Sequence, residues 1–221
     1  MSIVFLVRHG ESQSNAGLPT VGPEYVALTP QGREQALSVA NFLESYPPDL
    51  IITSRYSRTQ QTAAPTKERF PCARMEEWDV QEFTYLSSMH HTSSTKEYRQ
   101  PMVDAYWEQS LPDFRDGPDS ESFRAFIRRV QAFIIRLQNA ASKHDTIVVF
   151  SHQQFISAVL WLMKHGGGVH MSRQTMRDFK YFLASRPIPN GGIVQMKVYH
   201  NQLSKHYERI FKHLERVLIL L

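Results

Sequence analysis

The chain has 221 residues and a formal net charge of +4 at pH 7; 42% of its residues are hydrophobic and 21% are charged. This composition is close to the globular average, and it excludes a disordered, collagen-like or low-complexity protein. The single cysteine, Cys72, excludes an internal disulfide and a four-cysteine zinc site. No linker or repeat divides the chain, so we expect one domain over residues 1–221.

Apolar stretches are too short for a targeting or membrane segment. The run at residues 3–7 lacks a basic flank, and no window approaches the roughly 18 apolar residues that a membrane helix needs. We therefore expect a soluble cytoplasmic protein that binds neither a membrane nor nucleic acid. The mild positive charge by itself would fit nucleic acid or small anionic substrates equally well.

The first half of the chain alternates predicted strands and helices. Short apolar, β-branched runs predict buried strands, and Thr29 with Pro30 forms a helix start, as N-cap and first helical residue. The expected elements are a strand at 3–7, a helix from 30 to the Pro47-Pro48 pair, a strand at 50–53, a helix at 57–69 and a strand at 72–75.

The second half continues this alternation after an irregular stretch at 84–118, which contains one expected helix at 98–109. Apolar residues spaced by three, four and seven predict a long helix over 120–143 with Ser120 as N-cap. The remaining expected elements are a strand at 146–150, helices at 153–164 and 173–184, a strand at 193–199 and a C-terminal helix at 203–221.

This order predicts an α/β fold: a three-layer sandwich with a mainly parallel central sheet flanked by helices, and a lid-like insertion at residues 84–118. In such sheets ligands bind beyond the carboxyl ends of the strands. Three strand ends carry cationic or titratable side chains, and these are Arg8 with His9, Arg55 with Arg58, and His152. Arginine forks bind phosphate or carboxylate, and histidine can act as nucleophile, acid or base. The pattern therefore indicates an anion site with reactive histidines.

The segments around these residues resemble the histidine phosphatase superfamily, also called phosphoglycerate mutase-like. Leu-Val-Arg-His-Gly-Glu-Ser at 6–12, followed by Asn15, is similar to its signature. The other similar blocks, in the family's order, are 54–63 with Arg58, 80–83 with Glu82, 120–130 and 148–152 with His152. Together the blocks span roughly residues 3–200.

The resemblance implies a covalent mechanism. His9 would attack phosphorus and form a phosphohistidine, which splits one difficult displacement into two easier ones. Arg8, Arg58 and His152 would surround the phosphoryl oxygens, with His152 cationic when the dianion is bound. Glu82 would protonate the leaving oxygen and then activate water, for which we expect a raised pKa. The resemblance implies no metal and no cofactor.

Two further residues are implied as substrate-binding, and each assignment has alternatives. Asn15 would donate a hydrogen bond to phosphate, and Gln153 stands where the family often has glycine, so its side chain or backbone would contact phosphate. The turn Asn190-Gly191-Gly192 also differs from the family's common version. Neighbours that compete for the same roles are Arg55 for Arg58, and Glu76, Glu77 and Asp79 for Glu82. His90 and His91 lack a chelating spacing, and we interpret them as loop histidines.

Three functions remain open on this evidence. The first is a histidine acid phosphatase-type phosphoric monoester hydrolase acting on a small phosphorylated substrate. The second is a 2,3-bisphosphoglycerate-dependent phosphoglycerate mutase, and the third is a catalytically weak protein that binds phosphorylated ligands. The 70 residues from Glu82 to His152 are similar to the compact phosphatase branch, so we favour the phosphatase. The aromatic and basic residues of 84–118 predict a lid suited to a ring-bearing substrate, and a homodimer remains open.

Overall fold

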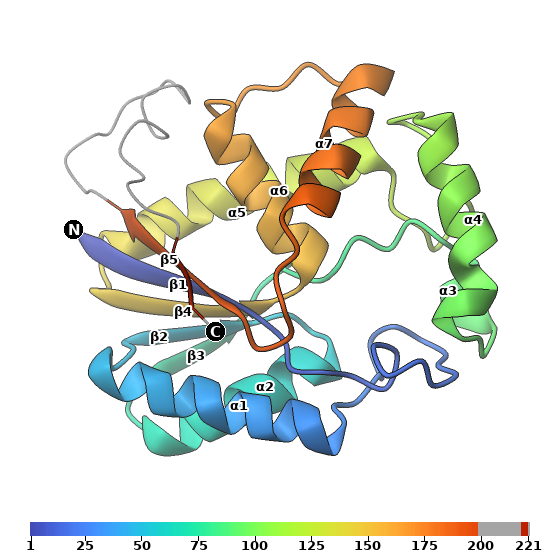
Figure 1. Cartoon of the computed structure of the whole chain (residues 1–221). Helices are drawn as coiled ribbons and strands as arrows, with labels where there is room; N and C mark the ends of the chain where they lie inside the picture. Colours follow the sequence, from blue (N-terminus) through green and yellow to red (C-terminus); the bar gives the residue numbers. More distant parts are fainter. Residues whose placement is uncertain (199–217, 221) are drawn as a thin grey trace.

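The computed structural model describes residues 1–198 and 218–220, which form a six-stranded sheet with helices around it (Figure 1). The strand order is β3-β2-β4-β1-β5-β6. β1, β2, β3 and β4 run parallel, whereas β5 is antiparallel to β1 and β6 to β5. The mainly parallel sheet is therefore confirmed. The strands are β1 Ser2–Arg8, β2 Leu50–Thr53, β3 Arg74–Glu77, β4 Thr146–Ser151, β5 Ile193–Val198 and β6 Leu218–Leu220.

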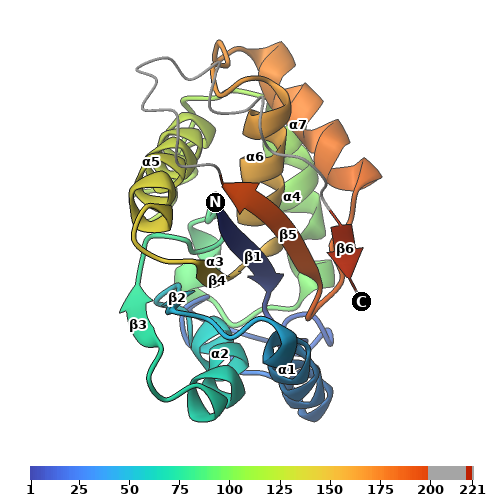
Figure 2. The ribbon, with the colours of Figure 1, turned by 90° about the vertical axis from the view of Figure 1, so that its left-hand side faces the viewer.

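Helices cover both faces of the sheet and confirm the three layers. Figure 2 shows α1 and α2 on one side, and α5, α6 and α7 on the other. α3 and α4 stand beyond the carboxyl end of β1 (Figure 1). The helices are α1 Pro30–Phe42, the short 3-10 turn η1 Leu43–Ser45, α2 Ser57–Arg69, α3 Ser88–His91, α4 Lys96–Gln109, α5 Phe123–Ala141, α6 Gln153–Lys164 and α7 Arg173–Ser185.

The alternation of side chains along β1 divides the core in two. Val4 and Leu6 belong to the cluster under α5, α6 and α7, whereas Phe5 and Val7 belong to the cluster over α1 and α2. Successive side chains of a strand point to opposite faces, so a strand with helices on both sides must be apolar throughout. Burial of each such side chain stabilises the fold by about 1.5–3 kcal/mol.

Several element boundaries differ from the expectation. The third strand lies at 74–77 and not at 72–75. The long helix begins at Phe123 because the Ser122 hydroxyl accepts the hydrogen bond of the Ala125 amide, which makes Ser122 the N-cap. Ser120, the expected cap, instead bonds both backbone groups of Gly117 and closes a turn.

The C-terminal helix expected over 203–221 is wrong where the structure describes it. Leu218–Leu220 pairs antiparallel with β5, Ile193 opposite Leu220 and Gln195 opposite Leu218. The rest of that prediction, 203–217 and 221, lies outside the described residues. Within the described part of the chain, no helix is long and apolar enough to cross a membrane.

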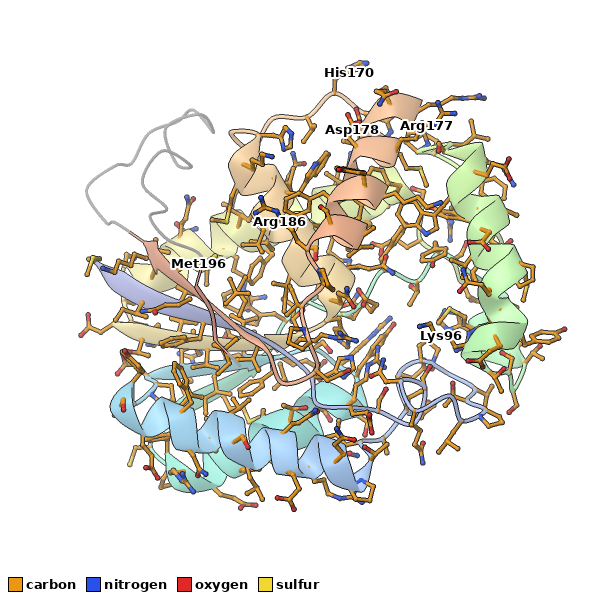
Figure 3. All side chains as sticks on the ribbon, in the orientation of Figure 1. Lys96, His170, Arg177, Asp178, Arg186 and Met196 are labelled. Carbon is orange, nitrogen blue, oxygen red and sulfur yellow. The ribbon has the colours of Figure 1, made fainter. Side chains whose placement is uncertain are left out.

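The insertion at 84–118 buries Tyr85, Tyr106 and Trp107 in the core, and none of its aromatic residues lines the cavity beside His9. Tyr85 and Tyr106 stack at 4.5 Å between ring centroids, and Trp107 packs against Phe179 of α7. Tyr98 is 64% exposed, and Lys96, also exposed, marks the start of α4 in Figure 3. The aromatic part of the lid prediction is therefore wrong, because these rings pack against the helices that cover the sheet. The insertion nevertheless reaches the cavity beside His9, which Met89 and Arg99 line.

Candidate active site

Strand register brings the predicted histidines together. Arg8 of β1 lies opposite Ser151 of β4, so the residues that follow them, His9 and His152, are neighbours. Their ring centroids are 5.1 Å apart. β2 ends in the same register, and Ser54 just beyond it places its hydroxyl 2.9 Å from His152 Nε2. Parallel pairing thus gathers three separate chain segments at one edge of the sheet, as expected.

The hydrogen bonds of His9 decide which ring nitrogen is free to react. Its Nδ1 lies 2.7 Å from the carbonyl of Gly10, an acceptor, so Nδ1 carries the proton. Its Nε2 then holds the lone pair, and it accepts from Arg58 Nε at 3.2 Å. His9 is 4% exposed. Burial, with Arg58 and Arg8 beside it, lowers the pKa of His9 well below 6.5. The ring is therefore neutral at physiological pH, with a lone pair on Nε2.

Two glycines hold His9 in place. A side chain on Gly10 would put its Cβ 2.3 Å from the carbonyl oxygen of Gly32, and one on Gly32 would come within 2.0 Å of the Glu11 carbonyl oxygen. The loop after β1 therefore lies directly on the start of α1, an approach open only to residues without Cβ. The Gly10 amide also donates to Thr62 of α2. Both helices on this face therefore fix the loop that carries His9.

Two guanidinium groups stand beside His9. Arg58, the second residue of α2, is buried, donates to the carbonyl of Pro23 and lies 4.8 Å from the centroid of the Tyr56 ring. Burial lowers the pKa of Arg58 to about 10, so it stays cationic at neutral pH. Arg8 donates to the Ile188 carbonyl at 2.5 Å, and its buried Nε has no partner among the described residues. That donor suits a ligand oxygen. Arg55, the competing residue, is exposed.

His152 occupies the N-cap position of α6, makes no capping hydrogen bond with its side chain, and is fully buried. Its Nε2 contacts Ser54, whereas its Nδ1 is buried without a partner in the described structure. Burial, and then the charge of Arg58, lowers the pKa of His152 well below 6.5. Without an anion His152 is therefore neutral, and the expected cationic form depends on the charge of a bound phosphate.

Glu82 lies at the N-terminus of α6, and its carboxylate accepts hydrogen bonds from three backbone amides. Gln154 N and Phe83 N are each 3.1 Å from Oε1, and Phe155 N is 3.3 Å away. Burial raises the pKa of Glu82, although Arg58 and these amides oppose the shift. Glu82 lines the same cavity as His9, whereas its competitors Glu76, Glu77 and Asp79 do not.

The cavity beside His9 has a volume of about 150 Å³. Asn15 lines it with a fixed amide: its Oδ1 accepts from the Ser12 amide at 3.1 Å and from Asn190 Nδ2 at 3.0 Å, which leaves Nδ2 as a donor for a ligand. Asn190 also donates to the His9 carbonyl, so the unusual turn at 190–192 supports the site. Gln153 does not line the cavity; the amide of its neighbour Gln154 holds Glu82.

Some residues around the site were not found from the sequence. Ser54 orients His152, and Ser14 lines the cavity. Ser54 follows a predicted strand and could have been found by the strand-end argument. Arg99 is one of the basic residues of the predicted lid, but its place in the cavity depends on a contact with Ser14, 85 residues away. His90 and His91 form part of α3 and lie beside Glu24 and Asp119, and neither lines the cavity that contains His9.

Arg129 is expected to position Glu82. Its guanidinium forms two bonds with Glu121, at 2.9 and 2.7 Å, and donates to the carbonyls of Asp79 and Gln81. It thereby holds the segment that immediately precedes Glu82. We expect Arg129→Gln to lower the free energy of unfolding by about 1–3 kcal/mol and kcat by roughly tenfold, because Glu82 loses its support. Denaturant unfolding and steady-state kinetics measure both effects.

Arg124 is the matched control on the same helix. It forms an equally bidentate pair with Asp113, at 2.5 and 2.9 Å, but the pair is exposed and distant from the cavity. Exposed pairs contribute little, so Arg124→Gln should leave kcat unchanged. Equal effects of the two substitutions on kcat would contradict a positioning role for Arg129.

Comparison with known proteins places this geometry in context. Residues 4–185 match the model of the histidine phosphatase superfamily, branch 1. The chain is 30% identical over 163 residues to an adenosylcobalamin/alpha-ribazole phosphatase of Salmonella typhimurium, covering 71% of this chain and 77% of the relative. It is 35% identical over 137 residues to a probable phosphoglycerate mutase of Enterobacter, covering 58% and 60%.

Solved structures share the fold. The solved structure of mycobacterial hydrolase 1 matches this fold with a TM-score of 0.71 at 18% identity, over 100% of this chain and 98% of that chain. The alpha-ribazole phosphatase of Shigella flexneri matches with a TM-score of 0.66 at 24% identity, over 89% and 91%. At these identities the likeness establishes the fold alone.

Proposed function

The chain belongs to the histidine phosphatase superfamily, branch 1, and we propose that it hydrolyses a phosphomonoester through a phosphohistidine intermediate on His9. The observation that carries the proposal is the state of the His9 ring. Its Nδ1 proton is held by the Gly10 carbonyl, and its Nε2 lone pair accepts a hydrogen bond from the buried Arg58. The charge of the half-buried Arg8 also acts on the ring and lowers its pKa. A neutral imidazole with one fixed lone pair, surrounded by positive charge, is suited to attack on phosphorus.

In the first half of the reaction, His9 Nε2 attacks phosphorus and the bond from phosphorus to the ester oxygen breaks. Arg58 must leave Nε2 and turn toward the phosphoryl oxygens, where it joins Arg8 in stabilising the developing charge. The departing oxygen takes its proton from Glu82. Burial favours the protonated form of Glu82, which is the form that this step requires.

In the second half, the ionised Glu82 accepts a proton from water, and the water oxygen attacks the phosphohistidine. The bond from nitrogen to phosphorus breaks, inorganic phosphate leaves, and Nε2 regains its lone pair. The three backbone amides around Glu82 stabilise its anion between the two steps. Glu82 therefore acts once as acid and once as base, and the enzyme returns to its starting state.

We prefer hydrolysis over mutase activity because the phosphatase relatives are matched over a larger share of their length than the mutase relative. The phosphatases of Escherichia coli and Salmonella match over 76% and 77% of their lengths, whereas the probable phosphoglycerate mutase matches over 60%. The substrate classes of those phosphatases are not transferred, since pocket walls outside the matched motifs decide them.

Trapping of the intermediate tests the proposal. Rapid mixing with a phosphorus-labelled substrate and alkaline quench should retain up to one label per chain, released by mild acid, because phosphoramidates are stable to base and labile to acid. Peptide mapping should place it on His9 and not on His152. Label on another residue, or product formed without any retained label or burst, would overturn the mechanism. Release of free phosphate, without exchange between 2- and 3-phosphoglycerate, distinguishes hydrolysis from mutase activity.

A further inference from the structure

Arg99 is the third arginine that lines the cavity, and it lies on the insertion, whereas Arg8 is on β1 and Arg58 on α2. It belongs to α4 and is 6% exposed. Its Nη1 donates to the carbonyl and the hydroxyl of Ser94, at 2.6 and 3.0 Å, and its Nη2 donates to the Ser14 hydroxyl at 3.2 Å. It lines the same cavity as His9. Arginine has five N–H donors, so these three bonds do not exhaust it.

The charge of Arg99 is not neutralised within the described residues. None of the ion pairs found there includes Arg99, and its hydrogen-bond partners are all neutral. Burial of an unpaired charge is costly. Tying Ser94 to Ser14 does not require a cation, since a neutral donor would serve. The charge therefore points to an anionic partner that enters the cavity.

The phosphoryl group by itself does not account for this third cation. Arg8 and Arg58 adjoin His9, and their two positive charges match the two negative charges of a phosphate dianion. Burial raises the pKa of Glu82, and its protonated form adds no negative charge to the cavity. Arg99 enters from another element, beside Ser14 and Met89 and next to the bridge between Thr20 and Ser94. Arg99 therefore reaches the cavity from a different side-chain environment than Arg8 and Arg58, which adjoin His9.

We propose that Arg99, with Ser14, forms a second anion subsite, so that the substrate is a short phosphomonoester carrying a carboxylate or a second phosphate at its other end. This inference rests on the proposed function of the site. The cavity, about 150 Å³, is smaller than the roughly 300–1,000 Å³ that holds drug-sized ligands, which requires a short skeleton between the two anionic groups. The apolar walls Val21, Val26 and Met89 suit that skeleton.

Matched substrates test the subsite in the unaltered enzyme. We expect kcat/KM for phosphoglycolate to exceed that for 2-hydroxyethyl phosphate about 10–100-fold, as a charge-assisted hydrogen bond would produce. Ethylene glycol bisphosphate tests a second phosphate in the same way. A preference for phosphoglycolate identifies a carboxylate subsite, and a preference for ethylene glycol bisphosphate identifies a phosphate subsite. Equal kcat/KM for all three would overturn the inference.

Substitution of Arg99 assigns the preference to this side chain. Arg99→Met should reduce the ratio of kcat/KM values between anionic and neutral substrates to near one, mainly through KM. Arg99→Lys should retain part of it, because lysine keeps the charge without the planar fork. Arg177→Met is the matched control: Arg177 is exposed on α7 and lies at the outer end of that helix, away from the site (Figure 3). Loss of preference in the Arg177 variant, or its retention in Arg99→Met, would contradict the assignment.

A binding measurement separates the two proposals. Calorimetric titration of the inactive His9→Ala variant with phosphoglycolate and with 2-hydroxyethyl phosphate needs no turnover. Tighter binding of the anionic compound supports the subsite even if the enzyme hydrolyses neither. Hydrolysis of p-nitrophenyl phosphate together with equal binding of the two compounds would overturn the subsite and leave the phosphatase proposal intact.

Discussion

Replacement of His9 by alanine is expected to reduce hydrolysis of p-nitrophenyl phosphate by a factor of about 10⁵ or more, as loss of a covalent nucleophile does. The loss follows from the geometry: Nε2 is the one ring nitrogen of His9 with a lone pair, and Arg58 and Arg8 already lie beside it. The cations remain in the variant, so phosphate should still bind. Steady-state kinetics with a stopped phosphate assay measures the rate, and calorimetry measures the binding.

His170→Ala is the matched control for this substitution. His170 is exposed and lies in the loop before α7, far from the strand ends (Figure 3). The His170→Ala variant should therefore retain full activity. Thermal unfolding must show that His9→Ala is folded, which we expect because the variant removes a buried group and adds no bulk. Turnover within tenfold of the unaltered enzyme would reject His9 as the nucleophile.

Replacement of Glu82 by glutamine is expected to lower kcat/KM about 10²–10⁴-fold for alkyl phosphates, the range of general acid catalysis. The loss should be much smaller for p-nitrophenyl phosphate, because p-nitrophenolate leaves without being protonated. Glutamine keeps the size of the side chain and its acceptor oxygen for the amides of Gln154 and Phe155. Kinetics with a series of leaving groups measures the difference.

The same variant should change the pH profile. Glu82 must be protonated for the first step, and burial raises its pKa above 4.5, so kcat/KM should fall as the pH rises through that raised pKa. His9 must be neutral, and its lowered pKa places the acidic limb below pH 6.5. Glu82→Gln should abolish the alkaline limb and keep the acidic one. Glu77→Gln, an exposed neighbour on β3, should alter neither. An unchanged profile in Glu82→Gln would identify a different acid.

The sequence predicted the sheet and most of its helices because those elements depend on local patterns. β2 at 50–53, α2 at 57–69 and α6 at 153–164 have the predicted bounds, since apolar runs and periodicity report burial directly. The boundary of α5 was less accurate. Two serines stand two residues apart before it, and the backbone geometry, not the residue type, decides that Ser122 caps the helix.

The long-range interactions could not be predicted in the same way. The aromatic residues of 84–118 have the composition of a ligand-facing lid, yet Tyr85, Tyr106 and Trp107 pack in the core. Composition does not state which surface a side chain faces. β6 is a similar case: the pairing of Leu218–Leu220 with β5 is a contact between distant segments.

The sequence by itself indicated the family through its ordered motif blocks. It also determined that His9, Arg58 and His152 converge, because side chains directly after buried strands must meet at one edge of a parallel sheet. Only the tertiary structure decided which nitrogen of His9 is free, that Glu82 and not Glu76, Glu77 or Asp79 lines the cavity, and that Arg99 enters it. These features depend on burial and on hydrogen bonds between segments far apart in the chain, and neither is encoded in any local run of residues.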